Sequence, residues 1–287
     1  MDSPTPRDAE ISASKRRRSS SRSFSSFELV RDLIASLRAP GFWLYGAWID
    51  TSLQHRSQAF GAFWMIASTA LFVVMLGSLY SQVLDDNSST YFGHLAVGYV
   101  IWIFMQQLLV RSTRLFSGYQ SMIQNGYVKY TDYVLRGFAG QLIVLAHNLL
   151  VVLGAMLYAQ IALTSAVFVL IFTVPLLLLT ILGGSFFVSV IGARYADFGE
   201  LLQSLMRLGF FITPIIWTTG SGTKGTIVGP FIYLNPFYYI IEVVRGPLVY
   251  ARVPWFEIGV TAAMCVIIWV LASAVYARAK PYIPLWV

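Results

Sequence analysis

Residues 137–193 have the sequence GFAGQLIVLAHNLLVVLGAMLYAQIALTSAVFVLIFTVPLLLLTILGGSFFVSVIGA, which contains no Asp, Glu, Lys or Arg. One membrane-spanning helix needs about 20 consecutive apolar residues. The stretch is therefore too long for one crossing and has about the right length for two. A short polar break at Thr164-Ser165 divides it. We predict two membrane-spanning helices, over about 138–163 and 166–191.

The composition of the whole chain supports this interpretation. Apolar residues make up 57% of the 287 residues and charged residues 11%, whereas a typical soluble domain has roughly 45–50% and about 25%. A soluble fold of this size could not bury so much apolar surface. We therefore expect an all-α integral membrane protein. The only cysteine, Cys265, excludes an internal disulfide, and the three histidines lack the spacing of metal ligands.

Further apolar stretches complete a prediction of six transmembrane helices. They cover about 60–84, 92–110, 201–217 and 256–276. With six crossings, most cations outside the N-terminal region fall in loops or ends on one side; these are Arg111, Arg114, Lys129, Arg136, Arg194, Arg278 and Lys280. Cytoplasmic loops carry an excess of Lys and Arg. Both termini of this multi-pass chain are therefore expected in the cytoplasm.

The N-terminal region divides into two parts. Residues 1–24 are rich in Ser, Arg and Pro, which predicts a disordered basic cytoplasmic tail. Such a tail is typical of a segment beside anionic lipid rather than of nucleic-acid binding. Ser25 and Glu28 then fit a capping box that starts an amphipathic helix. Its apolar residues recur at three- and four-residue steps; they are Phe27, Val30, Leu33, Ile34 and Leu37. This helix lies either in the membrane interface or docked on protein.

Residues 218–254 follow the fifth predicted span and are expected outside. Most of them are apolar or aromatic, which is unusual for an exposed loop. Two short re-entrant helices in the outer leaflet explain this composition. The alternative, a further complete crossing, would require Glu242 and Arg245 to pass through the membrane and would place the C-terminus outside.

The sequence gives no indication of nucleotide chemistry in this chain. Residues 220–226, GSGTKGT, resemble a phosphate loop only superficially, because Lys224 is followed by Gly rather than Ser or Thr. No catalytic triad, acid pair or metal cluster occurs in the predicted spans. We therefore expect that the chain is not an enzyme and carries no cofactor. If ATP powers this protein, another chain binds it.

Two stretches resemble the signature of type-2 ATP-binding-cassette exporter permeases. Residues 193–217 begin ARYADFGELL and end LGFFITPIIW, and residues 234–245 are LNPFYYIIEVVR. The sequence looks most like the permeases that export O-antigen, capsule, teichoic acid or mycobacterial galactan. Its closing PYIPLWV, at 281–287, is similar to an ending common in the O-antigen and galactan branch. The resemblance covers about 27–287, so residues 25–287 are expected to form one six-span permease domain.

This resemblance implies partners and a cellular setting. The chain would form a homodimer in the bacterial inner membrane and bind two ATP-binding-cassette ATPase subunits, which hold ATP and Mg. It would export lipid-linked polysaccharide. A type-2 exporter of a small lipophile or drug is the main alternative. An integral-membrane glycan-processing enzyme and a secondary transporter are alternatives from other classes, and the lack of repeats and of carboxylates within the spans disfavours the transporter.

The resemblance also suggests where the ATPase subunits bind. A coupling helix is expected in the loop between the second and third spans, and a second contact at the start of the fifth. The residues concerned are Met122, Ile123, Gln124, Asn125 and Tyr127 in the loop, and Arg194, Asp197 and Glu200 at the second position. An ordinary positive-inside loop and solvated charges at a helix start are the respective alternatives.

A substrate path and outer gate are predicted where aromatic residues gather, because aromatic rings stack on the apolar faces of sugars. The residues are Arg207, Phe210, Phe211, Trp217, Phe231, Tyr233, Tyr238, Tyr239, Glu242 and Arg245. Arg207 either faces the conduit, where it would attract an anionic sugar or lipid phosphate, or extends to the cytoplasmic headgroups. Glu242 and Arg245 have the i, i+3 spacing of a pair on one helix. An interhelical hydrogen bond is expected from His147-Asn148.

Overall fold

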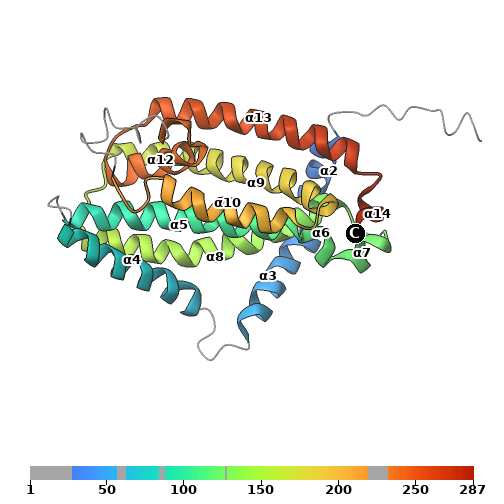
Figure 1. The fold of residues 1–287 in the computed structure, drawn as a ribbon, viewed down its shortest axis with the longest axis horizontal. Coiled ribbons are helices and arrows are strands. Elements are labelled where there is room, and N and C mark those ends of the chain that lie inside the picture. The colour runs from blue at the N-terminus through green and yellow to red at the C-terminus, as the bar shows by residue number, and fades with distance from the viewer. Residues whose placement is uncertain (1–27, 57–62, 84–87, 127, 219–231) are drawn as a thin grey trace, which may run out of the picture.

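The computed structural model describes residues 28–56, 63–83, 88–126, 128–218 and 232–287, and within these ranges the chain forms helices and no strand (Figure 1). The predicted all-α class is confirmed for this part of the chain. The predicted tail, the capping residue Ser25, Tyr127 and the first re-entrant helix with Phe231 lie outside the described residues.

The helices are numbered here in chain order. They are α2 (Glu28–Leu37), α3 (Gly41–Arg56), α4 (Phe63–Val83), α5 (Ser88–Thr113), α6 (Leu115–Gly118), α7 (Gln120–Gln124), α8 (Tyr130–Tyr158), the 3-10 helix η1 (Ser165–Val169), α9 (Leu170–Arg194), α10 (Phe198–Ile212), α12 (Pro236–Val249), α13 (Trp255–Ala279) and α14 (Ile283–Trp286).

The charge-free stretch forms two long helices, as predicted. The first, α8, ends at Tyr158, and a short connection leads into η1 and α9. Gln160 lies in this connection with a φ of 50°, a conformation that ends a helix. Four helical segments of the described chain are long and apolar enough to cross a membrane: Thr90–Thr113, Tyr130–Tyr158, Ser165–Arg194 and Trp255–Ala279.

The first and fifth predicted spans correspond to apolar helices that are shorter than predicted. Within α4, the apolar part is Ile66–Tyr80. Helix α10 ends at Ile212 rather than at 217, because Thr213 precedes Pro214 and adopts an extended conformation (φ −79°, ψ 135°). The ring of a proline disfavours helical geometry in the residue before it. That all six segments cross the membrane remains a prediction.

Helix α5 lies at the centre of the bundle. In an 18-residue apolar segment of α5, 67% of the residues are buried, against 22% in the corresponding segment of α13. Trp102, Phe104 and Leu108 are among its fully covered side chains. Figure 1 shows α5 between α8 and α10, with α13 along one long edge of the molecule. Residues of α5 therefore face several other helices at once.

The predicted amphipathic helix corresponds to α2, and one of its faces docks on protein. Leu29 is buried, and Asp32 accepts hydrogen bonds from Lys280 Nζ at 2.7 Å and Tyr276 Oη at 2.8 Å. Part of the predicted apolar stripe faces outward instead; these exposed residues are Val30, Ile34 and Leu37. The helix thus combines a docked face with an apolar face that is free to enter a membrane surface.

The contact between α5 and α9 yields a stability prediction. A Cβ added at Gly192 would lie 2.0 Å from the carbonyl oxygen of Thr113. We expect Gly192→Ala to lower the free energy of unfolding by on the order of 3 kcal/mol, because the two backbones must separate. Thermal unfolding in detergent measures the effect, with the reaction of Cys265 with a thiol-reactive dye as the signal that reports unfolding. Gly154→Ala is the matched control, because its Cβ meets nothing within 4 Å. Equal unfolding midpoints for the two variants would contradict this packing.

Candidate functional site

A groove of about 1630 Å³ runs between α3, α4, α5, α6, α8 and α10. Three of these helices contribute side chains spaced three or four residues apart, which share one helix face. From α5 these are Tyr99, Trp102, Ile103, Gln106, Gln107, Val110 and Arg111, and Arg114 follows directly after this helix. From α8 they are Gly137, Gly140, Gln141, Val144 and Asn148, and from α10 they are Gln203, Arg207, Phe210 and Phe211. The groove is therefore built from three helix stripes.

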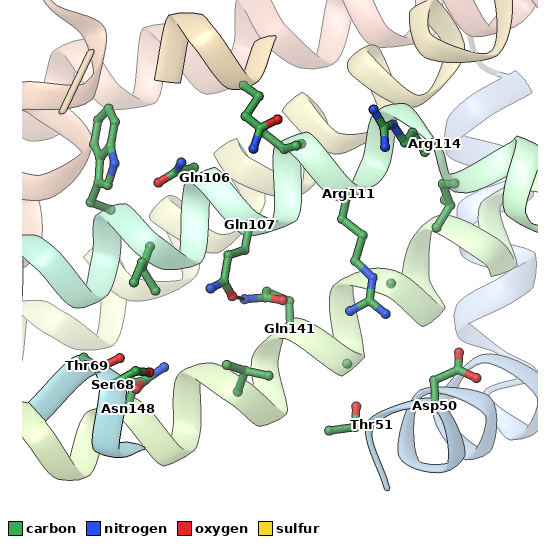
Figure 2. Close-up of a pocket in the computed structure, with 18 of the residues that line it drawn as sticks. Asp50, Thr51, Ser68, Thr69, Gln106, Gln107, Arg111, Arg114, Gln141 and Asn148 are labelled. Carbon is green, nitrogen blue, oxygen red and sulfur yellow. Dashed lines mark hydrogen bonds between the residues drawn. The ribbon is translucent and has the colours of Figure 1, made fainter. Parts of the chain in front are cut away.

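The chemistry of the lining changes along the groove. Arg114 and, on α5, Arg111 occupy the end nearest α6, glutamines follow on α5, and Trp102 and Tyr99 occupy the other end. Figure 2 shows Arg111 and Arg114 on the same side as Asp50, with Gln106, Gln107 and Gln141 at mid-length and Asn148 at the opposite end. Along the α5 wall a ligand would therefore meet cations, then amides, then aromatic rings, whereas on α10 Arg207 lies between Gln203 and the ring of Phe210.

Arg136 is fixed at the cationic end of the groove. It makes a bidentate ion pair with Asp50, with Nε–Oδ2 and Nη2–Oδ1 distances of 2.7 Å each. Tyr119 Oη donates to the same carboxylate at 2.9 Å. Burial would raise the pKa of Asp50, but hydrogen bonds from Arg136 and Tyr119 outweigh it, so that the pKa is lowered. Burial raises the pKa of Tyr119 to about 12 despite the opposite effect of Arg136, so its hydroxyl remains a donor.

Arg111 and Arg114 are left more available than Arg136. Arg114 lies 3.7 Å from Glu200, and both side chains are largely exposed. Such a pair contributes little in solvent. Within the described residues Arg111 makes no salt bridge. The two guanidinium groups can therefore bind an anion that enters this end of the groove.

Amide side chains occupy the middle of the groove. Gln141 Nε2 of α8 donates to Gln107 Oε1 of α5 at 2.7 Å. Asn148 is 3% exposed, and its Oδ1 accepts no hydrogen bond from the residues that the structure describes. The sequence predicted an interhelical hydrogen bond from His147-Asn148. Instead, His147 makes a hydrogen bond within α8, where its Nδ1 lies 2.7 Å from the carbonyl oxygen of Ile143.

Aromatic rings line the end of the groove remote from Arg114. Phe72 and Tyr99 stack with their ring centroids 4.0 Å apart, and Phe210 meets Phe72 edge to face at 6.2 Å. Phe211 lies next to Phe210, with centroids 5.6 Å apart. The predicted path residues Arg207, Phe210 and Phe211 thus all line the groove. Arg207 is exposed where it lines the groove, and that it faces a conduit for substrate remains a prediction.

The other described gate residues lie apart from the groove, around α12. Trp217 packs against a cluster that contains Tyr238 and Tyr239, and Tyr239 Oη donates to the carbonyl oxygen of Tyr233 at 2.8 Å. Together with Glu242 and Arg245 they form an aromatic and ionic cluster that does not line the groove. The predicted path residues therefore separate into two groups.

Arg245 joins α12 to two other elements. It is 1% exposed and pairs with Glu242, itself 2% exposed, through Nε–Oε2 at 2.9 Å and Nη2–Oε2 at 2.7 Å. Its Nη1 donates to the carbonyl oxygen of Pro214 at 2.6 Å and lies 3.2 Å from His94 Nε2 of α5. Arg252 holds the second oxygen of Glu242. The spacing-based pairing of Glu242 with Arg245 is confirmed.

Of the residues predicted to contact the ATPase, those of α7 and Arg194 at the end of α9 lie near α14. Met122, Gln124 and Asn125 are exposed at α7, whereas Ile123 is buried beneath it and so anchors this short helix instead. Gln124 Nε2 donates to the carbonyl oxygen of Val287 at 3.3 Å. The guanidinium of Arg194 lies 5.3 Å from the ring of Trp286. The residues Asp197 and Glu200 are exposed at the start of α10. Their contact with an ATPase remains a prediction.

A comparison with known protein families identifies the chain. The family model of the ABC-2 type transporter matches residues 45–249. The chain belongs to the ABC-2 type transporter family. No curated protein matches the sequence. An ABC-2 permease is the membrane component of an ATP-binding-cassette exporter and associates with an ATPase partner. The family resemblance of residues 193–217 and 234–245 is thus confirmed at this level, and the matched range includes the groove and the Glu242–Arg245 pair.

Four amides of the groove in this ABC-2 permease were not predicted from the sequence. They are Gln106, Gln107, Gln141 and Gln203. A signal was available for two of them, because Gln107 lies four residues from Arg111, and Gln203 lies three residues from Glu200 and four from Arg207. Uncharged amides carry no titratable group, so a search for charges and rings passes over them.

The Arg245 network gives a second stability prediction. Glu242→Ala leaves Arg245 as an uncompensated buried charge, so we expect a loss of about 3–5 kcal/mol of unfolding free energy. The double variant Glu242→Leu/Arg245→Leu should recover much of that loss. Chemical unfolding of the purified permease measures both variants. Arg114→Ala, which removes an exposed ion pair, is the control and should change stability little. A double variant no more stable than Glu242→Ala would refute the pairing energy assigned here.

Proposed function

We propose that this ABC-2 permease exports a lipid-linked polysaccharide, similar to O-antigen, across the bacterial inner membrane. It would act as a homodimer with both termini in the cytoplasm and with two ATPase subunits bound at that side. The observation that carries the proposal is the groove, whose lining combines arginines, amides and aromatic rings and changes in that order along α5.

The order of these groups suits a lipid-linked glycan. The phosphates that join a glycan to its lipid are anionic, and guanidinium groups bind phosphate through paired N–H donors. Sugar hydroxyls both donate and accept hydrogen bonds, as amides do. Aromatic rings pack on the apolar faces of sugar rings. One molecule that carries phosphate and sugar therefore matches all three parts of the groove.

The main alternative is a small lipophile or drug as the exported molecule. Sites for such ligands are lined mostly by apolar side chains with only a few polar groups. The aromatic end of the groove fits this description. The arginines and glutamines along the rest of the groove do not fit this description. Keeping polar groups in an apolar bundle costs free energy, and an apolar ligand gives them no hydrogen-bond partners. We therefore favour the glycolipid.

In the proposed mechanism this chain conducts and couples, and the partner supplies the energy. ATP and Mg are held by the ATPase subunits, whose closure moves the cytoplasmic contacts at α7 and at the start of α10. That motion opens a conduit between the two permeases. Arg111 and Arg114 draw the anionic group in, and the region around α12 controls the outer end. No residue of this chain makes or breaks a covalent bond.

Deletion of the gene tests the proposed function directly. We expect cells without the permease to lack the surface glycan and to accumulate lipid-linked polymer inside, as detected by glycan staining of intact cells and lipid extracts. A variant of the partner ATPase that cannot hydrolyse ATP should give the same result. A normal surface glycan together with increased sensitivity to a lipophilic drug would instead support the alternative.

The cationic end of the groove yields a more specific prediction. We expect Arg111→Gln/Arg114→Gln to lower the export rate by about tenfold or more, because charge-assisted hydrogen bonds to phosphate are lost. Pulse-labelled glycan appearing at the cell surface measures the rate. Arg278→Gln, which removes an exposed charge at the end of α13, is the matched control. Equal rates for the two variants would refute the role of the groove arginines.

A further inference from the structure

Amide groups from two helices face each other at mid-length of the groove, in the position that a sugar would occupy if the proposed function is correct. The Gln141–Gln107 bond joins α8 to α5 and fixes the orientation of both side chains. Gln141 is 3% exposed, whereas Gln107 is exposed and lines the groove, so a ligand in the groove can reach the pair from the α5 side. Figure 2 shows this pair between Gln106 and the helix α8. A preoriented pair of amides is a more selective hydrogen-bonding surface than two mobile side chains.

The amide pair retains unused hydrogen-bonding capacity. A glutamine side chain offers two N–H donors and an acceptor oxygen. The bond between the two uses the oxygen of Gln107 and one donor of Gln141. Within the described residues the Nε2 group of Gln107 makes no hydrogen bond. Donors and an acceptor thus remain for a ligand that has hydroxyl groups.

Asn148 is a second, independent indication of a ligand. It lines the same groove, is 3% exposed, and has an Oδ1 without a donor in the described part of the chain. Figure 2 shows its side chain beside those of Ser68 and Thr69 of α4. Buried polar atoms are nearly always hydrogen-bonded, and each exception calls for an explanation. A ligand hydroxyl that donates to Oδ1 would supply the missing bond.

The position of the amides relative to the arginines limits what the ligand is. Arg111 lies one helical turn from Gln107 on the same face of α5, which corresponds to about 6 Å along the helix axis. An anionic group bound at Arg111 would therefore have its immediate neighbour in the ligand at the amides. In a glycan joined to lipid through phosphate, that neighbour is the first sugar. Tyr99, which stacks on Phe72, lies eight residues from Gln107 on α5, which corresponds to about 12 Å further along the helix axis.

We infer that Gln107, Gln141 and Asn148 form a subsite in which the two glutamines bind the sugar nearest the phosphate and Asn148 binds a sugar further along the groove, and that this subsite makes the permease select a glycosylated lipid phosphate over a bare one. This inference rests on the proposed function. It identifies the part of the substrate that the permease recognises. A site whose polar groups stay unpaired without the correct ligand discriminates strongly against an analogue that lacks the partner groups. Bare lipid phosphates, which occur in the same membrane, are thereby excluded.

Two soluble probes test this selection with the full chain in lipid nanodiscs. The first is farnesyl pyrophosphate, and the second is the same molecule with a disaccharide of N-acetylglucosamine on its terminal phosphate. Quenching of tryptophan fluorescence gives the Kd of each. We expect the glycosylated probe to bind at least about tenfold more tightly to the natural chain. In Gln107→Leu/Gln141→Leu and in Asn148→Leu the ratio of the two Kd values should fall towards one.

A matched control and a stability measurement separate recognition from folding. His147→Leu changes the neighbouring position of α8, which does not line the groove, and should keep the ratio of the natural chain. Asn148→Leu should unfold at the same temperature as the natural chain or higher, because it removes an unpaired buried acceptor. A lower midpoint would assign Asn148 a structural role and would remove it from the subsite.

The outcomes distinguish this inference from the proposed function. Equal Kd values for the two probes with the natural chain would overturn the subsite and leave glycolipid export standing. Failure of both probes to bind would overturn the subsite and the proposed function together. A ratio that stays near ten in the amide variants would show that selection arises elsewhere in the groove.

Discussion

The arrangement of this helix bundle depends most on the ion pair and hydrogen bonds of the buried Arg245 guanidinium. In an apolar bundle a charge persists only if nearly all of its hydrogen bonds are made within the protein. Arg245 meets that condition by binding Glu242 of α12, the carbonyl oxygen of Pro214 after α10 and His94 of α5. Three elements far apart in sequence are thereby fixed relative to one another. Helix α10, which carries one wall of the groove, is positioned in part by this contact at its end.

The polar groups of the bundle separate into those that are satisfied and those that are not. The Arg245–Glu242 network and the Arg136–Asp50 pair are internally paired and fix structure. Arg111, Gln107 and Asn148 keep unused hydrogen-bonding capacity, and all three line the groove. This contrast connects the fold to transport, because the polar groups that line the groove can bind a ligand, and the buried Oδ1 of Asn148 gains a missing hydrogen bond when it does. A permease of the ABC-2 family, in which an ATPase partner supplies the energy, needs such a binding surface more than it needs chemistry.

The sequence was sufficient for those features that depend on local composition and spacing. The absence of charge over 137–193 predicted two helices, and the i, i+3 spacing predicted the Glu242–Arg245 pair; both are present. The early end of α10 also had a local signal in Pro214. The contacts of Arg245 with His94 and of Gln107 with Gln141 could not be predicted, because they join residues brought together only by tertiary packing. The predicted path residues also divided between the groove and α12, a separation that spacing along one chain does not reveal.

Site-specific photo-crosslinking tests most directly whether the groove is the path of the exported molecule. A photoreactive benzoylphenylalanine at position 106, which lines the groove, would be activated in cells whose partner ATPase is inactive, so that substrate remains in the permease. The same residue at position 270 of α13, where Val270 is exposed on the outside of the bundle, serves as the control. The account predicts that radiolabelled sugar is attached to the permease from position 106 and not from position 270. Equal labelling from both positions, or labelling from position 270 alone, would contradict it.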